Sequence, residues 1–229
     1  MSTPEPAAGT AGTAADTAVD TAADTAVSVL DLVPVLPVVV LDDLATAVPT
    51  ARALVDGGLP AIELTLRTPV ALEAIRAIAA EVPEIAIGAG TITSPSQAEA
   101  AAEAGATFLV SPGATPGLLA AMLATGLPFL PGTSTVSEVM AVLDAGVTEM
   151  KFFPAEAAGG TPYLKAVAGP LPHARFCPTG GITPASAPGY LALPNVGCVG
   201  GSWITPAELV AARDWERISK LAAEAAALR

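Results

Sequence analysis

Three observations predict an α/β fold in which eight parallel strands close into one (β/α)8 barrel. The chain has 229 residues, a length common among barrels of this kind. Short runs of β-branched and apolar residues alternate with Ala- and Leu-rich amphipathic stretches, which favours parallel βαβ units. Eight such units occur without a second domain, and this repeat count favours closure as a TIM barrel. An open doubly wound sheet is the alternative.

The first 27 residues differ in composition from the rest of the chain. They are rich in Ala, Thr and Asp and offer no large apolar side chains to bury. We therefore expect residues 1–27 to form a disordered extension, with a weak helix as the alternative. The barrel domain is expected to span residues 28–229.

The expected strands are short apolar runs that end in or beside Gly, Pro, Ser or Thr. In chain order they are residues 35–40 (VLPVVV), 61–66 (AIELTL), 85–90 (IAIGAG), 107–111 (TFLVS), 128–132 (PFLPG), 149–153 (EMKFF), 175–179 (RFCPT) and 197–201 (GCVGG).

Most expected helix starts carry a capping hydroxyl followed by proline at the first helical position. These pairs are Thr68-Pro69, Ser94-Pro95, Thr115-Pro116, Thr183-Pro184 and Thr205-Pro206. Capping-box spacing is found in the pairs Ser94 with Gln97, Thr135 with Glu138, and Thr205 with Glu208. The residues between each strand end and the next helix start then lie at the C-terminal face, where barrel enzymes hold their active sites.

The charge balance excludes some classes of partner. The formal net charge is −12, and the first 27 residues contribute four acidic groups and no basic one. The remainder is still acidic, which argues against nucleic-acid binding. A small anionic substrate stays possible, because a few positive groups inside a cleft can outweigh the global field.

Cysteine and histidine content narrows the chemistry further. Cys177 and Cys198 lack zinc-ligand spacing and fit buried thiols in a reducing compartment. His173 is the only histidine, so neither a histidine metal cluster nor a Ser-His-Asp triad can form. No apolar run is long enough to span a membrane, and no signal peptide is recognisable, which points to the cytoplasm.

Lys151 is the residue that points most directly to chemistry. It lies inside the apolar strand Met150-Lys151-Phe152-Phe153, whereas the other two lysines, Lys165 and Lys220, lie in helical segments. A lysine on a barrel strand is poorly solvated, which favours a neutral, nucleophilic amine. The alternative is a lysine at a strand end whose ammonium reaches water.

Period-2 alternation groups three polar residues on one face of the second expected strand. Glu63, Thr65 and Arg67 share one face, and Ile62, Leu64 and Leu66 share the other. If the polar face is inward, the carboxylate can transfer protons and the guanidinium can bind a substrate carboxylate. The alternative is a solvated Glu–Arg pair at the rim.

Glycine clusters end the third, seventh and eighth expected strands. They are Gly88-Ala89-Gly90-Thr91, Pro178-Thr179-Gly180-Gly181 and Gly200-Gly201-Ser202. The last two adjoin expected helix starts, where free backbone amides form an anion site. The loops after the seventh and eighth strands are a recurrent phosphate site in barrels. The alternative is an ordinary turn at each cluster.

From residue 28 onward the chain resembles the class I aldolases that act on 2-keto-3-deoxy-6-phosphogluconate (KDPG) and 4-hydroxy-2-oxoglutarate (KHG). The motifs that carry the resemblance are ALVDGGLPAIELTLRTP, EVPEIAIGAGTI, FLVSPGAT, PFLPGTSTVSEVM, MKFFPAE, RFCPTGGITP and VGCVGGSW. They occur in the family's order. The N-terminal 27 residues have no counterpart in this resemblance.

The resemblance implies catalytic roles for two residues. Lys151 would form the Schiff base with the keto acid, and Glu63 would be the general acid and base. Arg67 and Thr91 would hold the pyruvate carboxylate. Pro112 and Phe153 would shape the pyruvyl pocket.

The resemblance also implies how the rest of the substrate is held. Thr179 would contact the aldehyde part, and Gly180, Gly181 and Ser202 would bind the phosphate. Family members are typically homotrimers that need no metal or other cofactor. The implied partner is a phosphorylated keto acid, with no nucleic acid and no membrane.

Three rival functions stay open at this point. A 6-phosphogalactonate aldolase would share both the lysine and the glutamate. A non-catalytic barrel that binds phosphorylated metabolites would need the glycine loops but not Lys151. A phosphosugar isomerase or epimerase would need an acid/base pair but no lysine nucleophile.

Overall fold

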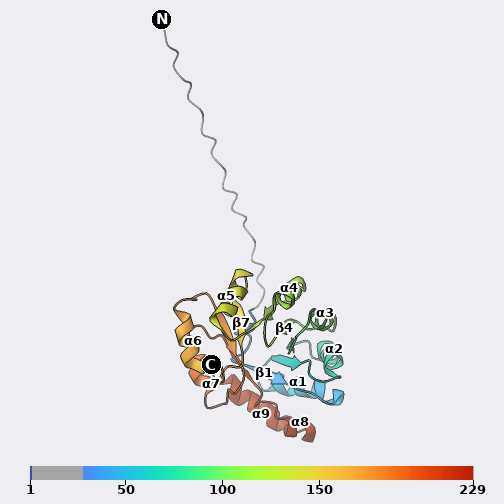
Figure 1. Ribbon diagram of the computed structural model, residues 1–229. Coiled ribbons are helices and arrows are strands. Elements are labelled where there is room, and N and C mark those ends of the chain that lie inside the picture. Colours follow the sequence, from blue (N-terminus) through green and yellow to red (C-terminus); the bar gives the residue numbers. More distant parts are fainter. Residues whose placement is uncertain (2–27, 229) are drawn as a thin grey trace.

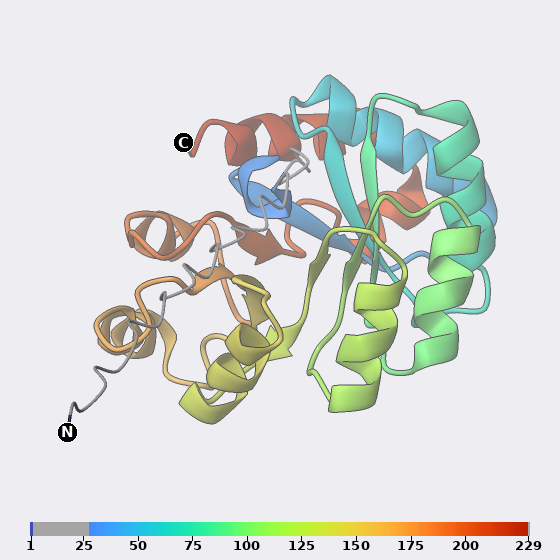
Figure 2. The same cartoon turned by 90° about the horizontal axis from the view of Figure 1, so that it is seen from above.

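The computed structural model describes Met1 and residues 28–228. Within this part of the chain, parallel strands form the centre of the molecule and helices pack outside them (Figure 1). Viewed from above, the helices follow one another around the strands (Figure 2). The predicted extension, residues 1–27, lies outside the described residues apart from Met1.

The strands follow the expected order. They are β1 (Val35–Val39), β2 (Ala61–Thr65), β3 (Ala86–Gly90), β4 (Phe108–Val110), β5 (Phe129–Leu130), β6 (Gly132–Thr133), β7 (Glu149–Phe152), β8 (Arg175–Pro178) and β9 (Val199–Gly201). The helices are η1 (Val29–Asp31), η2 (Leu44–Thr46), α1 (Ala47–Asp56), α2 (Ala71–Glu81), α3 (Pro95–Glu103), α4 (Pro116–Ala124), α5 (Val136–Asp144), α6 (Gly160–Ala168), α7 (Ala187–Leu191), α8 (Ala207–Ala212) and α9 (Trp215–Ala226).

The parallel sheet curls into a barrel, as predicted. One sheet runs β5-β4-β3-β2-β1-β9 and another runs β6-β7-β8. β5 and β6 are two parts of the fifth expected strand, separated at Pro131, which lacks an N–H to donate. Its carbonyl still accepts from the Lys151 N–H at 3.0 Å. Isolated bridges, Phe176 to Val196 and Thr179 to Gly200, join the β8 side to the β9 side.

Capping explains where several helices begin. The Ser94, Thr115 and Thr135 side chains each accept a backbone N–H of the first turn of α3, α4 and α5, as predicted. Thr135 and Glu138 form the complete capping box. At Ser94 the reciprocal half is displaced by one residue, since the Gln97 side chain accepts from the Thr93 N–H.

Three predicted helix starts were wrong. Thr68 donates its hydroxyl to the Leu41 carbonyl at 2.6 Å, and α2 begins only at Ala71. Thr183 forms a turn with Ser186 before the short helix α7. Thr205 is buried, and α8 begins after Pro206. Only the Thr68 hydroxyl makes a contact elsewhere that competes with a helix cap. Thr183 accepts the Ser186 N–H one turn before α7, and the Thr205 hydroxyl has no hydrogen-bond partner among the described residues.

The N-terminal end of the barrel is covered by residues 28–33. Val29, Leu30 and Val33 are buried in the core. The Arg175 guanidinium, at the start of β8, pairs with Asp31 and with Glu149, both at 2.7 Å. The segment therefore closes the base of the barrel and leaves the C-terminal face for the site. No described helix is long and apolar enough to cross a membrane.

Candidate active site

Lys151 and Glu63 meet inside the barrel. The Lys151 Nζ lies 3.0 Å from Glu63 Oε1, and the two side chains are 5% and 1% exposed. Glu63 comes from β2 and Lys151 from β7, 88 residues apart in the chain. The second carboxylate oxygen, Glu63 Oε2, is buried and has no hydrogen-bond partner among the described residues. A buried acceptor of this kind calls for a donor, which a bound substrate or water can supply.

The glycines of β3 make room for the Glu63 carboxylate. A Cβ on Gly90 would lie 2.3 Å from Glu63 Oε1, and a Cβ on Gly88 would lie 2.1 Å from the Phe108 ring. The cluster that ends the third strand was interpreted with the other glycine clusters as a feature of the site. Its physical role here is space, because the lumen next to Glu63 cannot hold further side chains.

Phe153 connects the lysine to the loop after β8. Its ring centroid lies 5.5 Å from the Lys151 Nζ. The same ring lies 3.3 Å from the position that a Cβ on Gly180 would take. Phe153 is followed by a cis peptide bond to Pro154. The ring thus forms one wall between the buried amine and the glycine loop.

Arg67 and Thr91 lie together on the C-terminal side of β2 and β3. The Arg67 Nε donates to Thr91 Oγ1 at 3.1 Å. Thr91 has a φ of 58°, a left-handed conformation that is uncommon for a residue other than glycine. This conformation follows Gly90 directly and turns the threonine hydroxyl toward the guanidinium. The pair was predicted to bind a carboxylate, and the structure brings the two residues together.

Pro112 follows β4 and packs against β6. A Cβ on Gly132 would lie 2.2 Å from the Pro112 carbonyl carbon. Gly132 is the register partner of Lys151 across the β6–β7 pair. Pro112 therefore lies just beyond the end of β4, next to the residue that pairs with Lys151. Its predicted role in the pyruvyl pocket stays a prediction.

The loops after β8 and β9 lie side by side. Thr179 is bridged to Gly200, so Gly180 and Gly181 follow on one strand and Ser202 on the next. Gly180 and Gly181 have φ values of 104° and 80°. Their backbone N–H groups donate to no acceptor within residues 28–228, and Ser202 is exposed. Free amides turned outward by left-handed residues form an anion site.

One expectation about these loops was wrong. The helices do not start next to the glycines, because α7 begins at Ala187 and α8 at Ala207. Both helices are short. An anion bound at these loops would therefore meet the loop amides and not a helix N-terminus.

Glu156 was given no role from the sequence, although it lies in the MKFFPAE motif. Its backbone N–H donates to the Gly180 carbonyl at 3.1 Å, and its carboxylate accepts the Tyr190 hydroxyl at 2.9 Å. Burial, followed by this hydrogen bond, raises the pKa of Tyr190. The signal in the sequence is only the short distance from Lys151, and it does not reveal the partner on α7.

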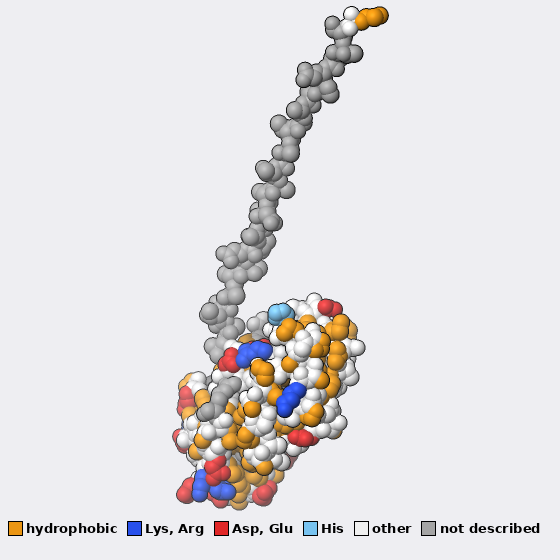
Figure 3. Space-filling view, turned by 90° about the vertical axis from the view of Figure 1, so that its left-hand side faces the viewer, with side chains coloured by type: hydrophobic (Ala, Val, Ile, Leu, Met, Phe, Trp, Pro, Cys, Tyr) orange, Lys and Arg blue, Asp and Glu red, His pale blue; other side chains and the backbone are white. Residues whose placement is uncertain are grey.

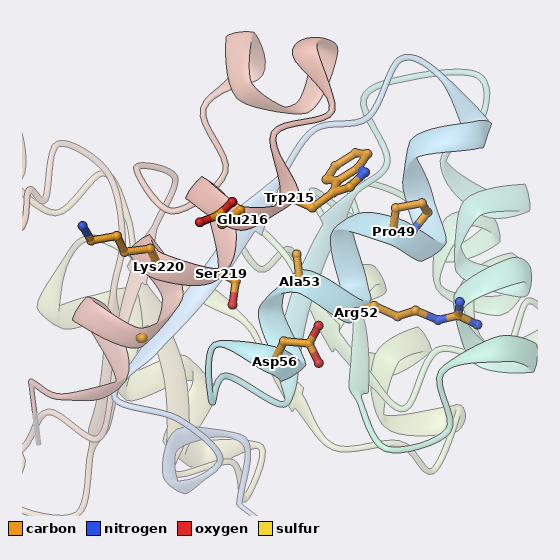
Figure 4. Close-up of a pocket in the computed structure, with 9 residues that line it drawn as sticks. Pro49, Arg52, Ala53, Asp56, Trp215, Glu216, Ser219 and Lys220 are labelled. Atoms are coloured by element: carbon orange, nitrogen blue, oxygen red, sulfur yellow. The ribbon is translucent and has the colours of Figure 1, made fainter.

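A separate groove lies away from the lysine. It has a volume of about 710 Å³ and runs between α1 and α9 (Figure 4). Pro49, Ala53 and Trp215 form its apolar part, with Arg52 and Lys220 at its edges. None of the predicted site residues lines it. We place the candidate site at Lys151, because a buried lysine in contact with a carboxylate supplies a nucleophile and a proton acceptor side by side.

The surface agrees with a small-molecule enzyme. The face shown in Figure 3 has apolar, acidic and basic side chains interspersed and no continuous basic area. Within the described part of the chain, no group of three or more His, Cys, Asp or Glu side chains could hold a metal ion. The barrel and the buried Lys151–Glu63 pair together define the protein as an α/β barrel with a lysine and a carboxylate in contact at its centre.

Comparisons with known proteins specify this class further. The family model described as KDPG and KHG aldolase matches residues 27–221. The KHG/KDPG aldolase of Escherichia coli K12 is 54% identical over 86% of this chain and 93% of its own length. The 2-dehydro-3-deoxy-phosphogluconate aldolase of Zymomonas mobilis is 50% identical over 88% and 95%. The chain belongs to the KDPG and KHG aldolase family.

Solved structures agree with this assignment. A KDPG aldolase from Legionella pneumophila, with pyruvate captured as a covalent carbinolamine, has a TM-score of 0.85. It is 46% identical and covers 86% of this chain and 96% of that one. A native KDPGal structure is 27% identical, with a TM-score of 0.76. The 6-phosphogalactonate alternative is therefore not favoured.

Proposed function

We propose that this protein cleaves 2-dehydro-3-deoxy-6-phosphogluconate to pyruvate and glyceraldehyde 3-phosphate through a Schiff base on Lys151. It also cleaves 4-hydroxy-2-oxoglutarate to pyruvate and glyoxylate. The observation that carries the proposal is the buried Lys151 Nζ at 3.0 Å from Glu63. The covalent pyruvate adduct of the Legionella relative supports it.

The reaction begins at the lysine amine. Glu63 accepts a proton from the ammonium, and the neutral Nζ attacks the C2 carbonyl of the keto acid. Glu63 returns this proton to the hydroxyl of the carbinolamine, which leaves as water and gives an iminium on Lys151, so Glu63 is again a carboxylate. The positive nitrogen is the electron sink that the next step requires.

Carbon–carbon cleavage follows. Glu63, directly or through one water, removes the C4 hydroxyl proton. The C3–C4 bond breaks, its electron pair forms the enamine, and the aldehyde leaves. Glu63 returns a proton to C3, and hydrolysis of the iminium releases pyruvate. The unpartnered Glu63 Oε2 supports this role, because one oxygen stays free while the other contacts Lys151.

Groups at the C-terminal face would hold the two ends of the substrate. Arg67 and Thr91 bind the pyruvate carboxylate, and Pro112 and Phe153 shape the pocket around the methyl end. Thr179 contacts the aldehyde part. The phosphate lies at Gly180, Gly181 and Ser202, three to four residues beyond the level of Lys151 on β8, or roughly 10 Å along the strand.

The wider proposal also covers the oligomeric state, the location in the cell and the need for a cofactor. A homotrimer is supported by exposed apolar side chains on α4 and α5, Leu123, Val136 and Met140. A cytoplasmic location is supported by the buried thiols of Cys177 and Cys198. No metal or other cofactor takes part, because the iminium itself supplies the electron sink.

One experiment tests the central proposal. The protein is incubated with pyruvate, reduced with borohydride, digested and mapped by mass spectrometry. We expect a single reduced adduct on the peptide that contains Lys151, and none in Lys151→Ala. An adduct on Lys165 or Lys220, or no adduct, would overturn the mechanism. Comparing turnover of 2-dehydro-3-deoxy-6-phosphogluconate with turnover of 2-dehydro-3-deoxy-6-phosphogalactonate then separates these two aldolase activities.

A further inference from the structure

The loop after β7 and the helix α7 pack beneath the glycine loop that follows β8. Beyond the last pair of the β7–β8 register, the Ala155 N–H donates to the Thr179 carbonyl at 2.8 Å. The Glu156 N–H then donates to the Gly180 carbonyl at 3.1 Å. The loop that carries Glu156 therefore continues the strand pairing and holds the backbone of residues 179–180 from below.

The Glu156 side chain fills the space under Gly181. Its Cγ and Cβ lie 2.8 and 2.9 Å from the position that a Cβ on Gly181 would take. The φ of Gly181 is +80°, so the residue is glycine both for its backbone conformation and for the close approach of Glu156. The conformation of the loop is thus set partly by this side chain.

Tyr190 fixes the carboxylate end of Glu156. The tyrosine comes from α7, is 1% exposed, and donates its hydroxyl to Glu156 Oε1 at 2.9 Å. A hydrogen bond to a charged acceptor is shorter and stronger than one between neutral groups. Burial, and then the neighbouring carboxylate, raises the pKa of Tyr190, so the hydroxyl keeps its proton and remains a donor.

We propose that Glu156 and Tyr190 are positioning residues that hold the Gly180–Gly181 loop in the conformation that binds the substrate phosphate. The inference rests on the proposed function, because it assigns the phosphate to this loop. The proposal gives neither residue a contact with the substrate. Lys151 is held by its own strand pairs with Gly132 and Cys177, and Glu63 by pairs with Val38 and Gly88. The two positioning residues therefore affect phosphate binding and leave imine formation unchanged.

Tyr190→Phe is the main test variant. It removes the hydroxyl and keeps the buried ring. We expect the KM for 2-dehydro-3-deoxy-6-phosphogluconate to rise about tenfold, as expected for the loss of one hydrogen bond to a charged group. The kcat for this substrate should not change. Cleavage of 4-hydroxy-2-oxoglutarate, which has no phosphate, should also stay the same, and so should the borohydride adduct with pyruvate.

Tyr163→Phe is the matched control. It removes the same atom from a tyrosine on α6 whose hydroxyl has no hydrogen-bond partner among the described residues. We expect no change in the KM of either substrate. Glu156→Gln keeps an acceptor for Tyr190 and should retain most of the phosphate binding, whereas Glu156→Ala should match or exceed the effect of Tyr190→Phe.

Inhibition by inorganic phosphate tests the loop without any aldol chemistry. We expect the inhibition constant of phosphate to rise in Tyr190→Phe by the same factor as the KM. An equal loss of activity on both substrates, or a Glu156→Gln variant as impaired as Glu156→Ala, would overturn the positioning role. So would an unchanged phosphate constant. If the unmodified protein forms no adduct with pyruvate, it is the proposed function that fails.

Discussion

At the scale of single residues, the buried pair of Lys151 and Glu63 combines stability and reactivity. Removing one partner of a buried ion pair leaves an uncompensated charge, which costs about 3–5 kcal/mol in typical cases. The pair also places a proton acceptor at 3.0 Å from the amine. The ion pair that compensates the charge of Lys151 in the folded protein is therefore also the contact through which the proposed reaction transfers a proton.

Glu63→Gln separates proton transfer from imine formation. The amide keeps the shape of the side chain but cannot accept the C4 hydroxyl proton. We expect kcat to fall by about 10²–10⁴-fold, the usual contribution of one general acid or base. The borohydride adduct with pyruvate should still form on Lys151, only more slowly, because water can take the ammonium proton in place of Glu63. Complete loss of the adduct together with turnover would show that the lysine cannot attack without Glu63, and would contradict this separation of the two steps.

Gly90→Ala tests the space beside Glu63. The new Cβ would lie 2.3 Å from Glu63 Oε1, so the carboxylate must move. Displacement by about 1 Å can cost about 100-fold in rate, and we expect a loss of that order in kcat/KM. Gly117→Ala is the control, because a Cβ there meets nothing within 4 Å. Full activity in Gly90→Ala would mean that the carboxylate position is not critical.

At the scale of the elements, the caps decide where the helices begin. Helix α5 shows this most clearly. The Thr135 side chain accepts the Glu138 backbone N–H, and the Glu138 side chain accepts the Thr135 backbone N–H. The Ser134 backbone N–H is the main cause of the lowered pKa of Glu138. A lowered pKa in the folded state means that the charged carboxylate contributes stability.

The capping box predicts a pH-dependent stability. Thr135→Ala should lower the free energy of unfolding by about 1 kcal/mol at pH 7. Glu138→Gln should also destabilise at pH 7. Its effect should begin to shrink below the ordinary glutamate pKa and vanish only below the lowered pKa of the folded state, where the wild-type carboxylate is protonated. Urea unfolding at pH 7 and over a series of acidic pH values measures this. Glu99→Gln, at an exposed glutamate, should change the stability at pH 7 little, and a pH-independent effect of Glu138→Gln would contradict the argument.

At the scale of the whole molecule, closure of the barrel assembles the site. The strands that carry Glu63 and Lys151 lie in different sheets, which are joined through the β5–β6 strand and the β8–β9 bridges. At the opposite end, Leu30 packs on Gly197, whose Cβ would lie 2.5 Å from the Leu30 Cβ. The N-terminal segment thus supports the strands from below.

Leu30→Ala tests this support. Replacing a fully buried leucine by alanine typically costs about 2–5 kcal/mol, which lowers the Tm of a domain of this size by roughly 5–15 °C. Scanning calorimetry measures the shift, and the pyruvate adduct should still form at room temperature. Leu44→Ala, at an exposed leucine, should change the Tm little. An unchanged Tm in Leu30→Ala would show that the segment does not support the barrel.

The fold and most of the site could be predicted because their signals are local or carried by motifs. Strand positions came from short apolar runs, and the N-caps at Ser94, Thr115 and Thr135 came from residue types at fixed spacing. The starts expected at Thr68, Thr183 and Thr205 were wrong, because a hydroxyl followed by proline does not by itself fix the first turn. The Thr68 hydroxyl bonds to Leu41, Thr183 caps a turn that precedes α7, and the Thr205 hydroxyl has no partner among the described residues. The roles of the site residues stay predictions.

The sequence by itself determined the alternation of strands and helices, the shared face of Glu63 and Thr65, and the unusual position of Lys151, because backbone periodicity and residue chemistry are local properties. Arg67, predicted to share that face, lies in the turn after β2, which ends at Thr65. Only the tertiary structure decided that the polar face points inward and that Glu63 meets Lys151 across 88 residues. It also decided that Tyr190 meets Glu156. Such pairings depend on strand register and barrel closure, which arise from the packing of the whole core and leave no mark at either residue.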